Sequence, residues 1–248
     1  MIPAQLSMEL AIVNEATTHT AGDSDTEPAS PLATISRRRL WLILAGIPTL
    51  YWINGFMPWS YRLFVKQDHD SYLAFMSCIV VLHWTSLAVV IATVRRSGAQ
   101  LSDIGVFWSV PRLLVLVAVV GIVGGGWIAM RSTWPATENP ESWQTMYPWT
   151  MTERWFFVFV SLTAGICEEV VYRGFAIRAL QARGMKTWQA LAVAALSFVL
   201  VHGLFGVFMS PLLVVAALIY SGLFLRPKSL TPGIYVHALF DVMAVAAV

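Results

Sequence analysis

The sequence is poor in charged residues. Only 12% of its 248 residues are Asp, Glu, Lys or Arg, whereas 57% are hydrophobic, and the mean hydropathy is +0.67. Soluble domains carry about 25% charged residues, so this balance excludes that class and predicts a polytopic membrane protein. The net charge is only +2, and no basic cluster interleaved with aromatics indicates a nucleic-acid partner.

Cysteine is also scarce, with only Cys78 and Cys167 in the chain. Both lie in apolar stretches, which excludes a disulfide framework and a Cys-rich metal site. A phosphate-binding loop is excluded as well, because the glycines near Gly125 are not followed by Lys-Ser/Thr. Gly121 and Gly125 instead have the GxxxG spacing that favours close helix packing.

Residues 1–36 contain no Lys or Arg and no sustained apolar run. Their Ala, Thr, Ser and acidic composition predicts a disordered tail. A secretory signal peptide is not expected, because it would need a basic region followed directly by an apolar one. Residues 37–248 are expected to form the transmembrane domain.

The rest of the chain predicts an all-α, polytopic transmembrane bundle. About seven apolar segments approach the roughly 20 residues that a spanning helix requires. They are expected near Leu40–Met57, Tyr72–Val94, Pro111–Met130, Thr152–Arg173, Trp188–Gly206, Phe208–Leu225 and Thr231–Val248.

The connections on alternate sides of these segments differ in basic residues. One side has eleven, namely Arg37, Arg38, Arg39, Arg95, Arg96, Arg112, Arg178, Arg183, Lys186, Arg226 and Lys228. The other has four, namely Arg62, Lys66, Arg131 and Arg154. The positive-inside rule therefore predicts a cytoplasmic N-terminus. Short loops and the missing signal peptide favour a bacterial plasma membrane, with a eukaryotic internal membrane as the alternative.

Few ionisable residues fall inside the apolar segments. They include Glu168, Glu169, Arg173, Asp241, His83, His202 and His237. A charged group at bilayer depth costs at least about 2.5–3.5 kcal/mol on insertion scales, so such residues indicate a functional site.

Glu168 and Glu169 are adjacent and point about 100° apart on a helix. Arg173 follows Glu169 at the i, i+4 spacing that brings side chains together, so Glu169 has an ion-pair partner and Glu168 is the freer carboxylate. Ala164 and Gly165, one turn back, would let a neighbouring helix approach closely. The alternative is a purely structural ion pair.

Two further segments each carry an i, i+4 pair. Phe198 and His202 share one helix face, and so do His237 and Asp241. The second pair could be metal ligands, a histidine oriented by an acid, or two groups that polarise a carbonyl. His83 has no charged neighbour at helical spacing, so we expect a packing or interhelical hydrogen-bonding role.

Three short motifs occur in order in separate segments: Glu168-Glu169-x-x-x-Arg173, Phe198-x-x-x-His202 and His237-x-x-x-Asp241. This combination resembles the CPBP family of intramembrane proteases, also called Abi or type II CAAX prenyl endopeptidases. Members have been described both as metalloproteases and as glutamic-type proteases. The resemblance covers the chain from about Trp155 to the end, with a family-like core expected at 152–248.

The resemblance implies roles for these residues. Glu168 and His202 would activate the attacking water, and His237 with Asp241 would bind the oxyanion or position the water. Glu169 and Arg173 would hold the helix and its field in place. Some relatives have Asn where this chain has Asp241, and an Asp cannot donate a hydrogen bond unless it is protonated. The glutamic-type chemistry needs no cofactor, whereas the metalloprotease interpretation would use zinc.

The expected function is therefore an intramembrane endopeptidase. Its substrate would be a membrane-embedded or membrane-anchored peptide or protein, either a prenylated CAAX terminus or a bacteriocin-related peptide. One alternative is a non-catalytic immunity protein or regulatory scaffold. A transporter is weaker because the chain has no inverted repeat, and Cys167 as nucleophile would need an aligned histidine.

Helical rise predicts one difficulty. Counted from Trp188, His202 lies roughly 10 Å nearer the external face than Glu168. We therefore expect either a strongly tilted fifth helix or a helix that begins below the membrane plane.

Overall fold

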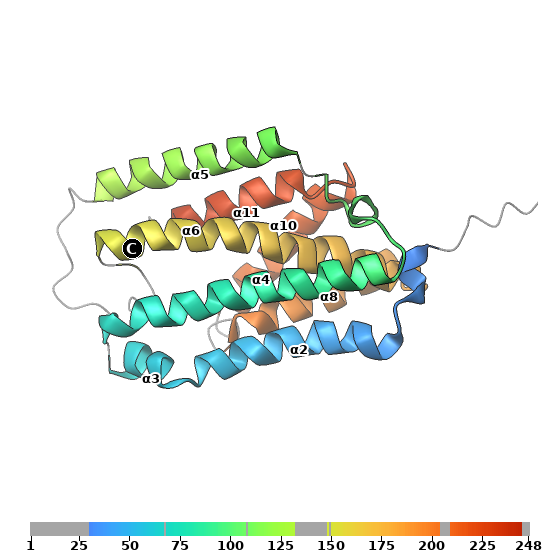
Figure 1. Ribbon diagram of the computed structural model, residues 1–248, viewed down its shortest axis with the longest axis horizontal. Helices are drawn as coiled ribbons and strands as arrows, with labels where there is room; N and C mark the ends of the chain where they lie inside the picture. The colour runs from blue at the N-terminus through green and yellow to red at the C-terminus, as the bar shows by residue number, and fades with distance from the viewer. Residues whose placement is uncertain are drawn as a thin grey trace, which may run out of the picture.

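A computed structural model describes residues 30–66, 68–107, 109–131, 148, 150–203 and 209–244. Within these ranges the regular elements are all helical, and the long helices run roughly parallel (Figure 1). The all-α prediction is confirmed. Residues 1–29, the greater part of the predicted tail, lie outside the described residues.

The helices agree with the predicted segments, with ends that shift by a few residues. Their bounds are α2 Arg37–Gly55, α3 Pro58–Val65, α4 Tyr72–Arg96, α5 Val110–Arg131, α6 Met151–Glu168, α7 Ile177–Ala182, α8 Thr187–Val201, α10 Ser210–Leu225 and α11 Thr231–Ala244. Short 3₁₀ turns form at η1 Pro31–Thr34, η2 His69–Ser71 and η3 Leu101–Ile104. A π-helical segment, η5 Glu169–Ala176, joins α6 to α7.

The short helix α3 was not predicted. Pro58 occupies the first turn of α3, where a missing N–H costs no hydrogen bond. The axis of α3 is bent by 62° from that of α2. The apolar run that begins at Leu40 therefore ends in a bend.

Helix α6 is the central helix of the bundle. It packs against α4, α5 and α11, and Figure 1 shows it between them. In the most apolar window of Met151–Ala182, 72% of the residues are buried, against 33% for Tyr72–Arg96 of α4. A capping box starts α6, because the Thr150 side chain accepts from the Glu153 N–H and the Glu153 carboxylate accepts from the Thr150 N–H.

Glycines allow the close approach of neighbouring helices to α6. A Cβ on Gly165 would lie 2.9 Å from Ala238 Cβ and 3.0 Å from the Ile234 carbonyl oxygen of α11, as the small-residue prediction required. The GxxxG prediction for α5 is only partly right. Gly125 lies against Trp155 of α6, as predicted. The other glycine that faces α6 is Gly124, which lies against Val158, whereas Gly121 has open space beside it.

The folded part begins before residue 37. Leu32 and Ile35 are buried, and the Arg183 guanidinium after α7 donates to the carbonyls of Ala33 and Ile35. Residues 30–36, which the sequence assigned to the tail, therefore pack on the bundle through η1.

The helices have the dimensions and surface of a membrane protein. Tyr72–Arg96 and Met151–Ala182 are long and apolar enough to span a bilayer, and α2 with α3 would make a third, bent span. Apolar helices such as α10 are shorter, about 24 Å at 1.5 Å per residue. Large apolar side chains such as Leu42, Val81 and Ile122 are exposed on the outside. The chain is an integral membrane protein.

Replacement of Gly165 by Ala tests the α6–α11 contact. We expect the free energy of unfolding to fall by about 1–3 kcal/mol, because the new methyl group meets backbone atoms that cannot move aside. Thermal unfolding in detergent measures the change. Gly46→Ala in α2 is the control, since nothing lies within 4 Å of its Cβ position, and an equal loss in both variants would contradict the contact.

Candidate active site

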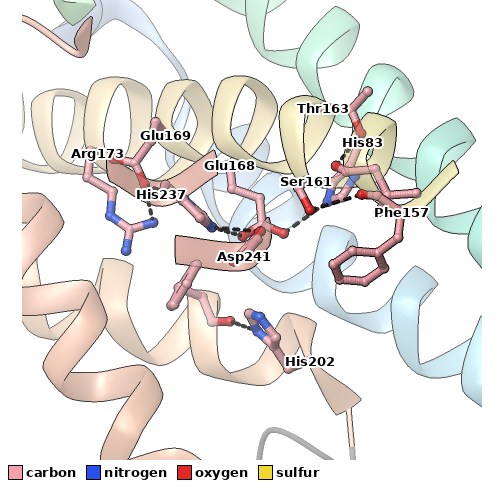
Figure 2. Close-up of polar contacts among 12 residues, drawn as sticks. His83, Phe157, Ser161, Thr163, Glu168, Glu169, Arg173, His202, His237 and Asp241 are labelled. Carbon is pink, nitrogen blue, oxygen red and sulfur yellow. Dashed lines mark hydrogen bonds and ion pairs between the residues drawn. The ribbon is translucent and has the colours of Figure 1, made fainter. Parts of the chain in front are cut away.

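Glu168 and Glu169 point to different neighbours, as their helical positions predicted. Glu168, the last residue of α6, lies 2.9 Å through Oε1 from His83 Nε2 on α4. Its Oε2 is buried and has no hydrogen-bond partner among the described residues. His237 Nε2 lies 3.8 Å from Oε2. Figure 2 shows Glu168 between His83 on one side and His237 with Asp241 on the other.

Glu169 opens the π-helical segment and is fully buried. Its Oε1 lies 3.1 Å from Arg173 Nη1 and 2.9 Å from His237 Nδ1. The predicted ion pair with Arg173 is therefore present, and a histidine from α11 shares it. Gly233 of α11 lets this carboxylate approach, because a Cβ there would lie 2.8 Å from Glu169 Oε2.

Aromatic rings surround the Arg173 guanidinium. Its Cζ lies 4.2 Å from the ring centre of Phe198 and 5.1 Å from that of Tyr220. Arg173 is only 1% exposed, so the rings and Glu169 replace the water that a buried cation lacks. Tyr220 also stacks on the His237 ring at 4.7 Å.

His237 links the two glutamates to Asp241. An ionised carboxylate can only accept hydrogen bonds, so His237 Nδ1 donates to Glu169. The other ring nitrogen, Nε2, lies 3.6 Å from Asp241 Oδ2 and 3.8 Å from Glu168 Oε2. Asp241 is the more open member, with 28% of its side chain exposed. His237 Nε2 thus faces two carboxylates, those of Asp241 and Glu168.

His202 stands at the end of α8, next to this cluster. Its Nδ1 donates to the Phe198 carbonyl at 2.8 Å, because a carbonyl oxygen can only accept. The Phe198 ring contacts both imidazoles, with its centre 5.0 Å from that of His202 and 6.1 Å from that of His237. The predicted difference in depth between His202 and Glu168 stays a prediction. Figure 2 shows no direct bond from His202 to Glu168.

Two further residues join this cluster. His83, for which we expected a packing or interhelical hydrogen-bonding role, forms such a bond from α4 to Glu168 on α6, but the sequence did not indicate its partner. Tyr51 of α2 packs on the His83 ring at 5.7 Å between centres. The only sequence signal was an unpaired histidine inside an apolar segment.

The described residues do not form a metal centre as they are arranged. No three His, Cys, Asp or Glu side chains in that part of the chain converge on one point. Instead, His83 is bonded to Glu168, and His237 is bonded to Glu169. The donors partner one another, so the zinc of the metalloprotease interpretation does not fit this arrangement.

Comparison with known proteins found a family match. Residues 150–243 match the family described as type II CAAX prenyl endopeptidase Rce1-like. These residues belong to that protease family. The resemblance predicted from about Trp155 onward is thereby confirmed over the Rce1-like domain, which contains every predicted site residue. No curated protein and no solved structure matches the chain.

Loss of the Arg173 side chain should destabilise the Rce1-like domain. We expect Arg173→Met to lower the free energy of unfolding by about 3–5 kcal/mol, because Glu169 would be left as an uncompensated buried charge. Adding Glu169→Gln should restore part of this loss. Chemical denaturation in detergent measures both, with exposed Arg62→Met as the control. If the loss in the double variant equalled the sum of the losses in the two single variants, the ion pair between Arg173 and Glu169 would be contradicted.

Proposed function

We propose that the chain is an intramembrane endopeptidase in which Glu168 activates a water molecule. The observation that carries this proposal is the state of the Glu168 carboxylate. Oε1 is held by His83, whereas Oε2 is buried and has no hydrogen-bond partner within the described ranges. A carboxylate oxygen with a free lone pair can take a proton from a water molecule that is placed against it.

The proposed reaction begins when Glu168 Oε2 takes a proton from a water molecule. The water oxygen then bonds to the carbonyl carbon of the substrate and gives a tetrahedral oxyanion. When that oxyanion collapses, the carbon–nitrogen bond breaks, and Glu168 returns its proton to the leaving amine. Atoms balance with water as the second reactant.

The neighbouring residues have supporting roles in this proposal. Nδ1 of His202 is held by the Phe198 carbonyl, so Nε2 is the nitrogen that would accept a hydrogen bond from the water. His237 Nε2, when it carries a hydrogen, donates to the oxyanion, and Asp241 orients it at 3.6 Å. Glu169 and Arg173 hold His237 and the π turn in place.

The substrate is proposed to be a peptide or protein segment at or within the bilayer. A prenylated CAAX terminus is one candidate, and a bacteriocin-related peptide is the other. We propose that the N-terminus faces the cytoplasm of a bacterial plasma membrane, with the protease domain from residue 37 onward. This orientation is supported by the helix ends that carry most of the basic residues, because such residues favour the cytoplasmic side. Figure 1 shows the start of α2, the end of α4 and the starts of α5 and α11 together at one end of the bundle.

Glu168→Gln tests the base. The amide has the same shape but cannot take a proton, so we expect turnover to fall by about 10²–10⁴-fold. Cleavage of a prenylated CAAX peptide by purified protein in lipid nanodiscs measures it. Comparison of membrane-protein termini in cells that carry either form detects other substrates.

Asp70→Asn is the control for this experiment, because it also removes one carboxylate but from an exposed position. Its turnover should equal that of the wild type. If the folded Glu168→Gln protein retained full function, the immunity or scaffold alternative would replace hydrolysis.

A further inference from the structure

The Glu168 carboxylate has a partner that lies outside the Rce1-like domain. His83 is on α4, whereas the family match begins at residue 150. His83 Nε2 and Glu168 Oε1 are 2.9 Å apart, and the two residues are 3% and 7% exposed. We infer that His83 is a positioning residue that orients the Glu168 carboxylate for water activation. This inference rests on the proposed function.

The hydrogen of this contact is assigned by its chemistry. An ionised carboxylate accepts only, so His83 Nε2 donates. The opposite nitrogen, Nδ1, is buried and has no hydrogen-bond partner among the described residues. A hydrogen on Nε2 therefore gains a charge-assisted bond, whereas a hydrogen on Nδ1 gains none. Among the site histidines, His202 and His237 have the opposite arrangement, with Nδ1 as the donor.

Packing fixes the ring that donates this bond. The Tyr51 ring of α2 lies 5.7 Å from the His83 ring, at an interplanar angle of 54°. Glu168 can therefore rotate only by breaking a buried bond, which costs about 1–3 kcal/mol for the group left unsatisfied. As a result, Oε1 stays on the α4 side and Oε2 stays toward His237 and Asp241 of α11.

The two glutamates differ in this respect. Glu169 Oε1 receives both Arg173 and His237, so its charge is neutralised by a cation and it serves structure. Glu168 has one histidine from α4 on Oε1. Oε2 of each glutamate lacks a hydrogen-bond partner among the described residues, but that of Glu169 lies against Gly233 in a fully buried side chain, whereas Glu168 is 7% exposed. We therefore assign the reaction to Oε2 of Glu168. His83 thus orients the Glu168 carboxylate through Oε1 and leaves Oε2 free to take the proton from water.

A pair of substitutions separates orientation from packing. His83→Leu keeps the bulk but removes the donor, and His83→Gln keeps a donor of similar reach. We expect His83→Leu to lower kcat by about 10–100-fold, as for partners that orient a reacting group, with KM unchanged. His83→Gln should recover most of this loss. Ser86→Ala, one turn along α4, is the control and should cleave as the wild type does.

Equal losses in the Leu and Gln variants, or a change in KM alone, would overturn the inference. A second measurement does not depend on cleavage. In the full-length protein labelled with ¹⁵N-histidine in detergent micelles, NMR should show the His83 hydrogen on Nε2, assigned by the signal lost in His83→Gln. A hydrogen on Nδ1 instead would overturn the inference. If Glu168→Gln cleaved normally, the proposed function would fail, and the NMR result would still decide the contact.

Discussion

The structure depends on the pairing of a few ionisable side chains within an apolar bundle. Charges that cannot reach water must find partners in the protein, and here each glutamate does so differently. Glu169 meets Arg173 and His237, whereas Glu168 meets His83 through one oxygen. Three helices, α4, α6 and α11, therefore have a fixed relation to one another, because displacement of any of them would leave a buried charge without its partner.

Small residues and an altered helical turn make this pairing possible. Gly165 and Gly233 let α11 lie against α6 closely enough for His237 to reach Glu169. The π-helical segment begins at Glu169 and contains Arg173. Such wide turns are frequent at functional sites because they redirect side chains that an α-helix would fix. The cluster is thus built into the packing of the central helix.

Much of this could be predicted from the sequence, because apolar length and i, i+4 spacing are local properties. The helices, the Glu169–Arg173 pair and the close approach at Gly165 all follow from such patterns. The partner of His83 could not be identified, since it is 85 positions away along the chain and helical spacing reveals neighbours only on the same helix. The π turn was missed because the spacing of apolar residues does not separate it from an α-helix. The bend at Pro58 was missed although a proline in the first turn of a helix is a local signal.

The central claim is that a buried carboxylate activates water directly. The most direct measurement is mass spectrometry of enzyme and product during a single turnover in H₂¹⁸O. The account predicts one ¹⁸O in the new carboxyl terminus and an enzyme whose mass does not change at any time. A covalent adduct on Cys167, or on any other side chain of the enzyme, would contradict it.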